Sequence, residues 1–343
     1  MALVNHRDPY VIGAALAAFT AQRLGVRDVR VVSAQHPSVG YTSETVIVEL
    51  GWSSETDSAH ERINDFVVRL APPAAATFRD YDLYQQTIAQ HAAADAGVPV
   101  ASPKLVTDEQ WLGCPFVVMP RIQGRIVGEV AAFDPWLLSL TETQRATVHT
   151  NYVGAVASIH RSDLALAAGV PTRDNHAELD FWSDYLDWSS AGSPVATLTE
   201  ALMWCRSHCP EVEGEPVLLW GDVRLGNVIF SDDLSILAIL DWDMTSIGAP
   251  EHDIAWLTTL ESTTRLLLGR DLAGFPDRAA IVARYESVSG RALQHFEWYE
   301  TLAMVRSTAI MTRISYLHRD AGFRLPMPID DNPLLDLIAK RIN

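Results

Sequence analysis

Short apolar runs separated by polar segments dominate the first third of the chain. Val, Ile and Phe are frequent in "VRVVSA", "TVIVEL", "FVVRL" and "PFVVM", which is typical of β-strands. The polar stretch "GWSSETDSAHERIND" between the second and third runs predicts a hairpin connection. An opening helix is expected, with Asp8 as N-cap, Pro9 in the first turn and Gly25 at the end. A second helix is expected from about Arg79 to Gly97.

From about Ala132 onward, longer stretches with helical periodicity replace the strand signals. The clear strands of this half lie in "LLWGDVRLGNVIFSDDLSILAILDWD", residues 218–243. A small mixed lobe with an antiparallel sheet (1–120) and a larger helical lobe (121–343) predict an α+β architecture. Helices are expected in six segments: 141–163, 177–190, 198–209, 251–263, 277–290 and 297–322.

Composition narrows the classes of function. The chain has 343 residues and a net charge of −17, with 26 Lys+Arg against 43 Asp+Glu, so it lacks the basic excess that nucleic-acid binding needs. No apolar run approaches the ~18 residues of a membrane span, and we expect a cytoplasmic protein. Three cysteines without framework spacing argue against a disulfide-built secreted domain. The oligomeric state stays open.

The segment 218–243 combines buried-type strands with polar side chains. "NVIF" and "ILAIL" are joined by the polar turn "SDDLS", which predicts an antiparallel hairpin. Its two ends carry Asn227 and Asp241, and neighbouring strands lie only about 4.8 Å apart. An amide oxygen and a carboxylate at that separation suit Mg²⁺ bound together with substrate phosphates.

Asp222 and Arg224 lie in the loop that precedes this hairpin, and they complete a set suited to phosphoryl transfer. In such chemistry one carboxylate accepts the proton of the attacking hydroxyl, metal ligands bind the phosphates, and a cation offsets charge on the transferred group. Each residue alone fits an ordinary turn cap, because Asp and Asn favour turns. Their combination on one hairpin favours a catalytic site.

The segment "WGDVRLGNVIF…AILDWDMTSIGAPEHDIAWL" resembles the phosphotransferase family that includes aminoglycoside and choline kinases, relatives of protein kinases. It is most similar to the branch found beside or fused to acyl-CoA dehydrogenases. The resemblance implies a protein-kinase-like two-lobe fold and ATP- and Mg²⁺-dependent transfer to a small-molecule hydroxyl. It implies that Asp222 is the catalytic base, that Asn227 and Asp241 are Mg²⁺ ligands, and that Asp253 steadies the loop. Trp220 stands where the family usually has His.

The first lobe then supplies the nucleotide contacts. "SVGYTSET", between two strand signals, resembles the family's phosphate-binding loop. Its hydroxyl and backbone N–H groups suit phosphate oxygens. The candidates in this loop are Ser38, Gly40, Thr42 and Ser43.

Three further nucleotide contacts follow from the resemblance. Arg69 ends "FVVRL" where the family usually has a lysine that pairs with phosphates, and it keeps the positive charge. The family's partner Glu corresponds to Gln85 or Gln86. Backbone groups near Met119 and Arg121 are expected to bind adenine.

Three hypotheses remain from the sequence. The first is a small-molecule kinase, the second an ATP-binding pseudokinase or regulator, and the third a Mg²⁺-dependent phosphohydrolase. The second is suggested by the altered lysine, glutamate and glycine positions. For a kinase, the dehydrogenase-associated resemblance suggests hydroxylated acyl or acid acceptors, whereas the acidic composition suggests cationic sugars. Aromatic and charged residues of the helical half fit core or solvated surface better than acceptor contacts.

Overall fold

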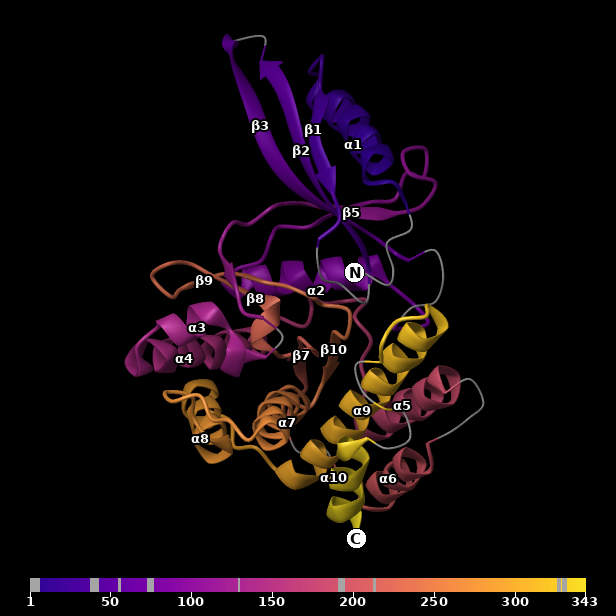
Figure 1. The fold of residues 1–343 in the computed structure, drawn as a ribbon, viewed down its shortest axis with the longest axis vertical. Coiled ribbons are helices and arrows are strands. Elements are labelled where there is room, and N and C mark those ends of the chain that lie inside the picture. Colours follow the sequence, from indigo (N-terminus) through magenta and orange to yellow (C-terminus); the bar gives the residue numbers. More distant parts are fainter. Residues whose placement is uncertain are drawn as a thin grey trace. The chain divides into compact units, whose positions relative to one another are not determined.

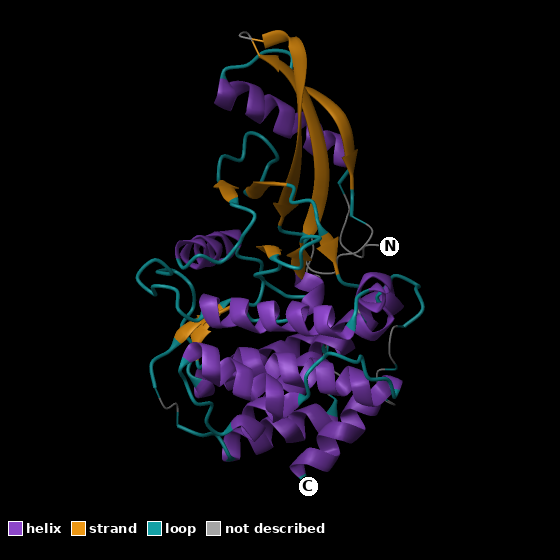
Figure 2. Ribbon diagram, turned by 90° about the vertical axis from the view of Figure 1, so that its left-hand side faces the viewer, coloured by secondary structure: helices purple, strands orange, loops and turns teal. Residues whose placement is uncertain are grey.

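The structure is a computed structural model that describes residues 7–37, 43–54, 57–72, 77–128, 130–190, 195–211, 214–325, 328 and 332–343, apart from the side chains of 53–62. Residue contacts divide the chain into two compact units. The first consists of Met1–Thr87 with Ala101–Ile122, and the second of Ile88–Val100 with Gln123–Asn343. Residues 1–120 and 121–343 remain our proposed domains. Strands predominate over helices in the first unit, and helices predominate in the second (Figure 2).

One five-stranded sheet forms the first unit. Its order is β1-β2-β3-β5-β4, and every neighbouring pair is antiparallel. Val46, Val48 and Leu50 alternate along the second strand and are fully buried, as the period-two pattern predicts. The strands, of which the long second and third stand out in Figure 1, are β1 (Arg30–Gln35), β2 (Glu44–Ser54), β3 (Asp57–Leu70), β4 (Lys104–Val106) and β5 (Phe116–Pro120).

The prediction of a long polar connection between β2 and β3 is wrong. Most of that polar stretch belongs to the two strands, and Gly51 pairs with Ile63 across them. Backbone N–H and C=O groups hold an antiparallel ribbon together whatever the side chains are. A hydrophobic pattern therefore detects only the part of a strand that faces an apolar core.

Helix α1 (Pro9–Leu24) begins and ends where the sequence predicts. The Asp8 carboxylate accepts a hydrogen bond from the backbone N–H of Tyr10 at 2.8 Å. Gly25 ends the helix with φ +65°, the left-handed conformation that glycine adopts at low cost. Ile12 is fully buried on the face that packs against the sheet.

Helix α2 (Leu83–Asp95) begins later than the predicted start near Arg79. Asp82 caps it, because its Oδ1 accepts hydrogen bonds from the backbone N–H groups of Tyr84 at 2.9 Å and Gln85 at 3.0 Å. An N-cap residue lies outside the helical conformation, so the preceding segment cannot continue the helix.

The second unit consists mainly of helices, and six of them overlap the six segments that the sequence predicts as helical. The short α3 and the C-terminal α10 are additional. The helices are α3 (Pro135–Ser139), α4 (Glu142–Ile159), α5 (Asn175–Ser189), α6 (Ala196–Ser207), α7 (Glu251–Leu268), α8 (Arg278–Ser289), α9 (Phe296–Asp320) and α10 (Pro333–Ile342), with 3-10 turns η1 (Ala131–Phe133) and η2 (Leu225–Asn227).

Two small sheets complete this unit. One has the order β6-β8-β9, and the other pairs β7 with β10. The β7–β10 pair lies outside the sequence prediction, because its short strands are brought together by long-range contacts alone. The strands are β6 (Arg125–Ile126), β7 (Val217–Leu219), β8 (Val228–Phe230), β9 (Ile236–Ile239) and β10 (Ser246–Gly248).

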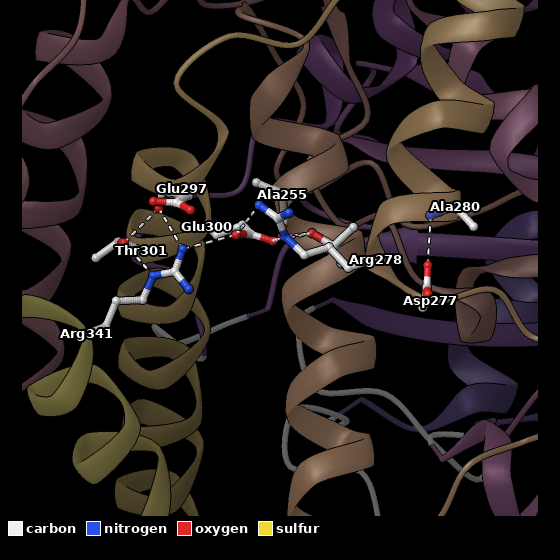
Figure 3. A network of polar contacts seen from close by, with 9 residues as sticks. Ala255, Asp277, Arg278, Ala280, Glu297, Glu300, Thr301 and Arg341 are labelled. Carbon is white, nitrogen blue, oxygen red and sulfur yellow. Dashed lines mark hydrogen bonds and ion pairs between the residues drawn. The ribbon is translucent and has the colours of Figure 1, made fainter.

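A buried carboxylate joins three of these helices near the C-terminus. Glu300 of α9 accepts hydrogen bonds from Arg278 of α8 at 2.5 and 2.9 Å, and from Arg341 of α10 at 3.0 Å (Figure 3). Arg341 also donates to Thr301 Oγ1 at 2.9 Å. The two guanidinium groups offset the cost of burying the Glu300 carboxylate. None of the helices in the described ranges combines the length and apolar character that crossing a bilayer requires.

Candidate active site

The loop after β7 brings three predicted site residues together. Oδ2 of Asp222 accepts hydrogen bonds from Nδ2 of Asn227 at 2.7 Å and from Nε of Arg224 at 2.9 Å. Asn227 Nδ2 also donates to the backbone oxygen of Asp222 at 3.1 Å. The Asp222 side chain is 16% exposed. Its carboxylate is therefore fixed in orientation while part of it remains accessible.

The hairpin formed by β8 and β9 follows this loop, as the sequence predicts. Val228 pairs with Ile239 in antiparallel register, and the Leu240 N–H donates to the Asn227 backbone oxygen at 2.8 Å. Asn227 and Asp241 thus lie at the open end of one hairpin. Asp241 has φ +57°, a left-handed conformation that Asp tolerates better than most residues.

The open end of the hairpin carries oxygen atoms of the kind that bind a hard divalent cation. The Nδ2 group of Asn227 donates to Asp222, so its side-chain oxygen is the atom available to a cation, and Asp241 adds a carboxylate. Mg²⁺ is often held by one or two protein carboxylates together with the phosphates of a substrate. In the part of the chain that the structure describes, no group of three or more His, Cys, Asp or Glu side chains is arranged to hold a metal. Asn227 and Asp241 are therefore the residues of this hairpin that could hold such a cation.

Asp253 of α7 holds the backbone at the start of the loop that follows β7. Its carboxylate, 1% exposed, accepts hydrogen bonds from the backbone N–H groups of Trp220 at 2.8 Å and Gly221 at 2.9 Å. Nε2 of His160 lies 3.0 Å from the same carboxylate, and its Nδ1 lies 2.7 Å from the Tyr285 hydroxyl. Asp253 therefore makes the contacts that a structural acid beneath this loop requires.

Trp220 ties the loop to the open end of the hairpin. Its ring is fully buried, and Nε1 donates to the backbone oxygens of Leu240 at 2.8 Å and Asp241 at 3.0 Å. The next residue, Gly221, has φ +91°, and a Cβ there would lie 2.2 Å from the backbone oxygen of Met244. Only glycine fits this position without moving the backbone of the turn at Met244.

The predicted phosphate-binding loop is described only at its end. Ser38, Gly40 and Thr42 lie outside the described residues. Ser43 is buried, and its Oγ accepts a hydrogen bond from Nε of Arg69 at 3.0 Å. The first unit thus places the end of this loop beside the cation of β3.

The other predicted nucleotide residues lie in or directly after β5 and in the first turn of α2. Met119 is buried in β5 and pairs with Val67 of β3. The backbone N–H of Arg121 donates to the Asp65 backbone oxygen at 2.9 Å, so this amide is already engaged within the first unit. Gln85 lies in the first turn of α2 and is half-buried.

The sequence prediction missed Trp256, which contacts the site, and Arg306, which contacts Trp256. Trp256 of α7 donates its indole N–H to Oδ1 of Asp222 at 3.0 Å. The guanidinium carbon of Arg306, from α9, lies 4.9 Å from the centre of the Trp256 ring and 5.1 Å from that of Trp182. Trp256 follows Asp253 by three positions, the helical spacing that places both on one face. Arg306 has no comparable local signal, because its partners come from other helices.

Burial shifts the ionisation of the groups near Arg306. Burial lowers the pKa of His252 to about 4. Burial alone would raise the pKa of Glu178, but Arg173 and Arg306 beside it lower this pKa to about 2. At neutral pH the Glu178 carboxylate is therefore charged and His252 is neutral.

A pocket of about 210 Å³ in the second unit opens beside the loop, and residues 223–226 form part of its wall. Glu261 in the wall pairs with Nε2 of His149 at 3.1 Å, and Arg265 pairs with Asp271 at 2.7 Å. The pocket therefore combines apolar walls with charged groups. Its principal lining side chains are Leu257, Leu260, Leu272 and Phe275 on the apolar side and Arg224, Glu261, Arg265 and Arg270 on the charged side.

The fold defines the class of protein. A Ralstonia eutropha JMP134 structure, assigned provisionally to the aminoglycoside phosphotransferases, aligns with a TM-score of 0.70 at 19% identity, over 96% of this chain and 97% of that one. A thermostable mutant of aminoglycoside phosphotransferase APH(4)-Ia, in a ternary complex with AMP-PNP and hygromycin B, aligns with a TM-score of 0.57 at 15% identity, over 96% and 97%. The chain has the kinase-like α+β fold of the aminoglycoside phosphotransferases.

The sequence places the chain within this class. The profile of the phosphotransferase enzyme family matches residues 44–293, and the chain belongs to that family. Acyl-CoA dehydrogenase family member 11 of Mus musculus is 24% identical over 235 residues, which are 65% of this chain and 29% of the mouse protein. The chain thus spans less than a third of the length of that relative.

Proposed function

We propose that the protein is a small-molecule kinase that uses ATP and Mg²⁺ and transfers the γ-phosphate to a hydroxyl. The observation that carries this proposal is the cluster of Asp222, Arg224 and Asn227, with Asp241 at the other end of the β8–β9 hairpin. Membership of the phosphotransferase enzyme family supports it. The AMP-PNP complex of APH(4)-Ia supports a nucleotide donor.

Asp222 acts in this proposal as the base that accepts the proton of the acceptor hydroxyl. A carboxylate has about four lone-pair sites, and the contacts to Asn227, Arg224 and Trp256 leave one for an alcohol proton. Because these contacts fix the orientation beforehand, little reorganisation is needed during the reaction. Arg224 places positive charge where the transferred phosphoryl group develops negative charge.

Asn227 and Asp241 would hold the divalent ion, through the amide oxygen and the carboxylate. The ion held by these two residues would supply positive charge that offsets the charge of the phosphates. The contacts of Trp220 with the Leu240 and Asp241 backbone keep that end of the hairpin in place.

The first unit supplies the nucleotide contacts in this proposal. Arg69, hydrogen-bonded to Ser43, would pair with phosphate oxygens, together with Ser38, Gly40 and Thr42. Gln85 would orient that cation in place of the family's glutamate. Adenine would bind to backbone groups of Met119 and Arg121, and for Arg121 the carbonyl is the group to test, since its N–H donates to Asp65.

The acceptor would bind in the pocket beside residues 223–226. Its walls carry three arginines and one glutamate. Arg224 pairs with Asp222 and Arg265 with Asp271, while Glu261 lies 3.1 Å from Nε2 of His149. Neither a polycation nor an anion is favoured by such a mixed lining. Cationic aminosugars and hydroxylated acids therefore belong side by side in an acceptor screen.

The decisive experiment compares the wild type with Asp222→Ala and with Asp232→Ala as a control. Asp232 is an exposed acid in the turn of the same hairpin, paired only loosely with Arg125 at 3.3 Å. Release of ADP and a new phosphomonoester signal in phosphorus NMR identify transfer. We expect Asp222→Ala to slow transfer by about 10²- to 10⁴-fold while Mg-ATP binding persists, and Asp232→Ala to behave as the wild type.

Other outcomes point to the alternatives. Mg-ATP binding without turnover on any acceptor would indicate a pseudokinase or regulator, a role that Arg69 at the lysine position favours. Release of phosphate without an acceptor would indicate a phosphohydrolase. Transfer that persists in Asp222→Ala would remove Asp222 from the role of base.

A further inference from the structure

A tryptophan makes the third contact to the proposed base. Asn227 and Arg224 both donate to Oδ2 of Asp222, whereas the indole N–H of Trp256 donates to Oδ1 at 3.0 Å. A carboxylate held at one oxygen can still rotate about its χ2 bond, but a carboxylate held at both is fixed. Trp256 is only 4% exposed, so its ring is held by the surrounding side chains.

Arg306 packs behind Trp256. Its side chain is 4% exposed, its guanidinium lies against the rings of Trp256 and Trp182, and NH1 is 3.8 Å from Glu178. Burial lowers the pKa of this guanidinium. Its buried Nε makes no hydrogen bond within the described part of the chain.

If Arg306 served only to fill space, an apolar side chain at this buried position would stabilise the fold at least as well. A buried guanidinium is stabilised when its N–H groups are hydrogen-bonded, and an apolar side chain of similar volume often serves stability as well or better. The two tryptophan rings and the Glu178 carboxylate at 3.8 Å satisfy the hydrogen-bonding capacity of this guanidinium only in part. Stacking on Trp256 does, however, immobilise the indole plane, and the positive charge lies behind the ring that binds Asp222.

We propose that Trp256, held by Arg306, is a positioning residue that fixes Oδ1 of Asp222 as the atom that receives the acceptor's proton. The inference rests on the proposed kinase function. Oδ2 has two donors in the structure, while Oδ1 has one and keeps a lone-pair site. The acceptor oxygen forms its bond to the γ-phosphorus as its proton passes to Oδ1. The bond from that phosphorus to the β–γ bridging oxygen breaks, and ADP leaves with the electron pair.

Trp256→Phe tests this role, and Trp298→Phe is the matched control. Both tryptophans are buried, and both lose one indole hydrogen bond, which Trp298 makes to the Cys205 backbone oxygen at 2.8 Å. We expect kcat of Trp256→Phe to fall by about 10- to 100-fold, the loss that follows from one hydrogen bond to a charged group. KM for ATP and for the acceptor should stay within about twofold. Trp298→Phe should keep the wild-type kcat.

Arg306→Met provides a second variant, since Glu178 retains its pairing with Arg173 at 2.7 Å. Its kcat should also fall with little change in either KM. A direct measurement, independent of turnover, is the indole resonance of Trp256 in ¹⁵N–¹H NMR. Of the ten tryptophan resonances, that of Trp256 should move most when Asp222 is changed to Ala.

The outcomes separate this inference from the proposed function. A wild-type kcat in Trp256→Phe, or equal losses in Trp256→Phe and Trp298→Phe, overturns the positioning role while the large loss of transfer in Asp222→Ala leaves the assignment of the base in place. A Trp256 indole resonance whose chemical shift does not change in Asp222→Ala also overturns the positioning role. Full transfer by Asp222→Ala instead overturns the assignment of the base.

Discussion

Replacing Asp253 by Asn should destabilise the loop that carries Asp222, although the two side chains have nearly the same shape. The carboxylate of Asp253 accepts two backbone N–H groups and faces His160, all within 3.0 Å. An Asn side chain has one oxygen, so one backbone N–H of Trp220 or Gly221 would face an NH₂ group. A buried donor without an acceptor costs about 1–3 kcal/mol, and hydrogen bonds to a charged group are worth about 1.5–3 kcal/mol. We therefore expect a loss of ~3 kcal/mol in the free energy of unfolding.

Urea unfolding and phosphoryl transfer measure the two consequences of Asp253→Asn. The matched control is Asp277→Asn, because Asp277 caps α8 by accepting from the Ala280 N–H at 2.9 Å, and Asn caps helices equally well. Asp277→Asn should change stability by less than ~0.5 kcal/mol, whereas Asp253→Asn should also slow transfer. Equal unfolding free energies for both variants would show that Asp253 does not support the loop in the way described.

Two further predictions concern stability. Because burial lowers the pKa of His252 to about 4 from an ordinary 6.5, the unfolded state binds the proton first as the pH falls. The free energy of unfolding should therefore fall from pH 6.5 downward, and His252 alone should contribute about 3 kcal/mol of this loss at pH 4. Urea unfolding at pH 7 and 4.5 should show a smaller loss in His252→Gln than in the wild type. An equal loss in the two proteins would contradict the assignment. Arg341→Leu removes a contact to Glu300, and it should lower the free energy of unfolding by about 1 kcal/mol and speed amide hydrogen exchange in α10. Lys340→Leu changes an exposed residue of the same helix and should have neither effect.

Local sequence signals predict the elements whose ends and partners lie close together in the chain. Asp8 and Gly25 mark the ends of α1, and the polar turn between two apolar runs marks the β8–β9 hairpin. The cluster of Asp222, Arg224 and Asn227 belongs to this group, because it spans only a few residues of one loop. Their catalytic roles follow from chemistry and family resemblance and stay a prediction.

Local sequence signals do not predict an element that forms only through contacts with a part of the chain distant in sequence. The continuation of β2 and β3 through polar residues rests on backbone pairing, which leaves no hydrophobic pattern. The β7–β10 pair consists of three-residue strands that are too short to show a period. The start of α2 depends on which of several polar residues acts as the cap, and the structure selects Asp82.

The sequence by itself determined the family, the α+β class and the loop with its hairpin, because these are encoded by residue types at short spacing. Tertiary structure alone decided through which contacts that loop is supported. Asp253 reaches Trp220 and Gly221, and Trp256 reaches Asp222, only once α7 lies against the loop after β7. Arg306 reaches Trp256 only after α7 and α9 pack together. Hydrogen bonds and ring contacts act over a few ångströms in space, and no local pattern records which distant residues the folded chain brings within that range.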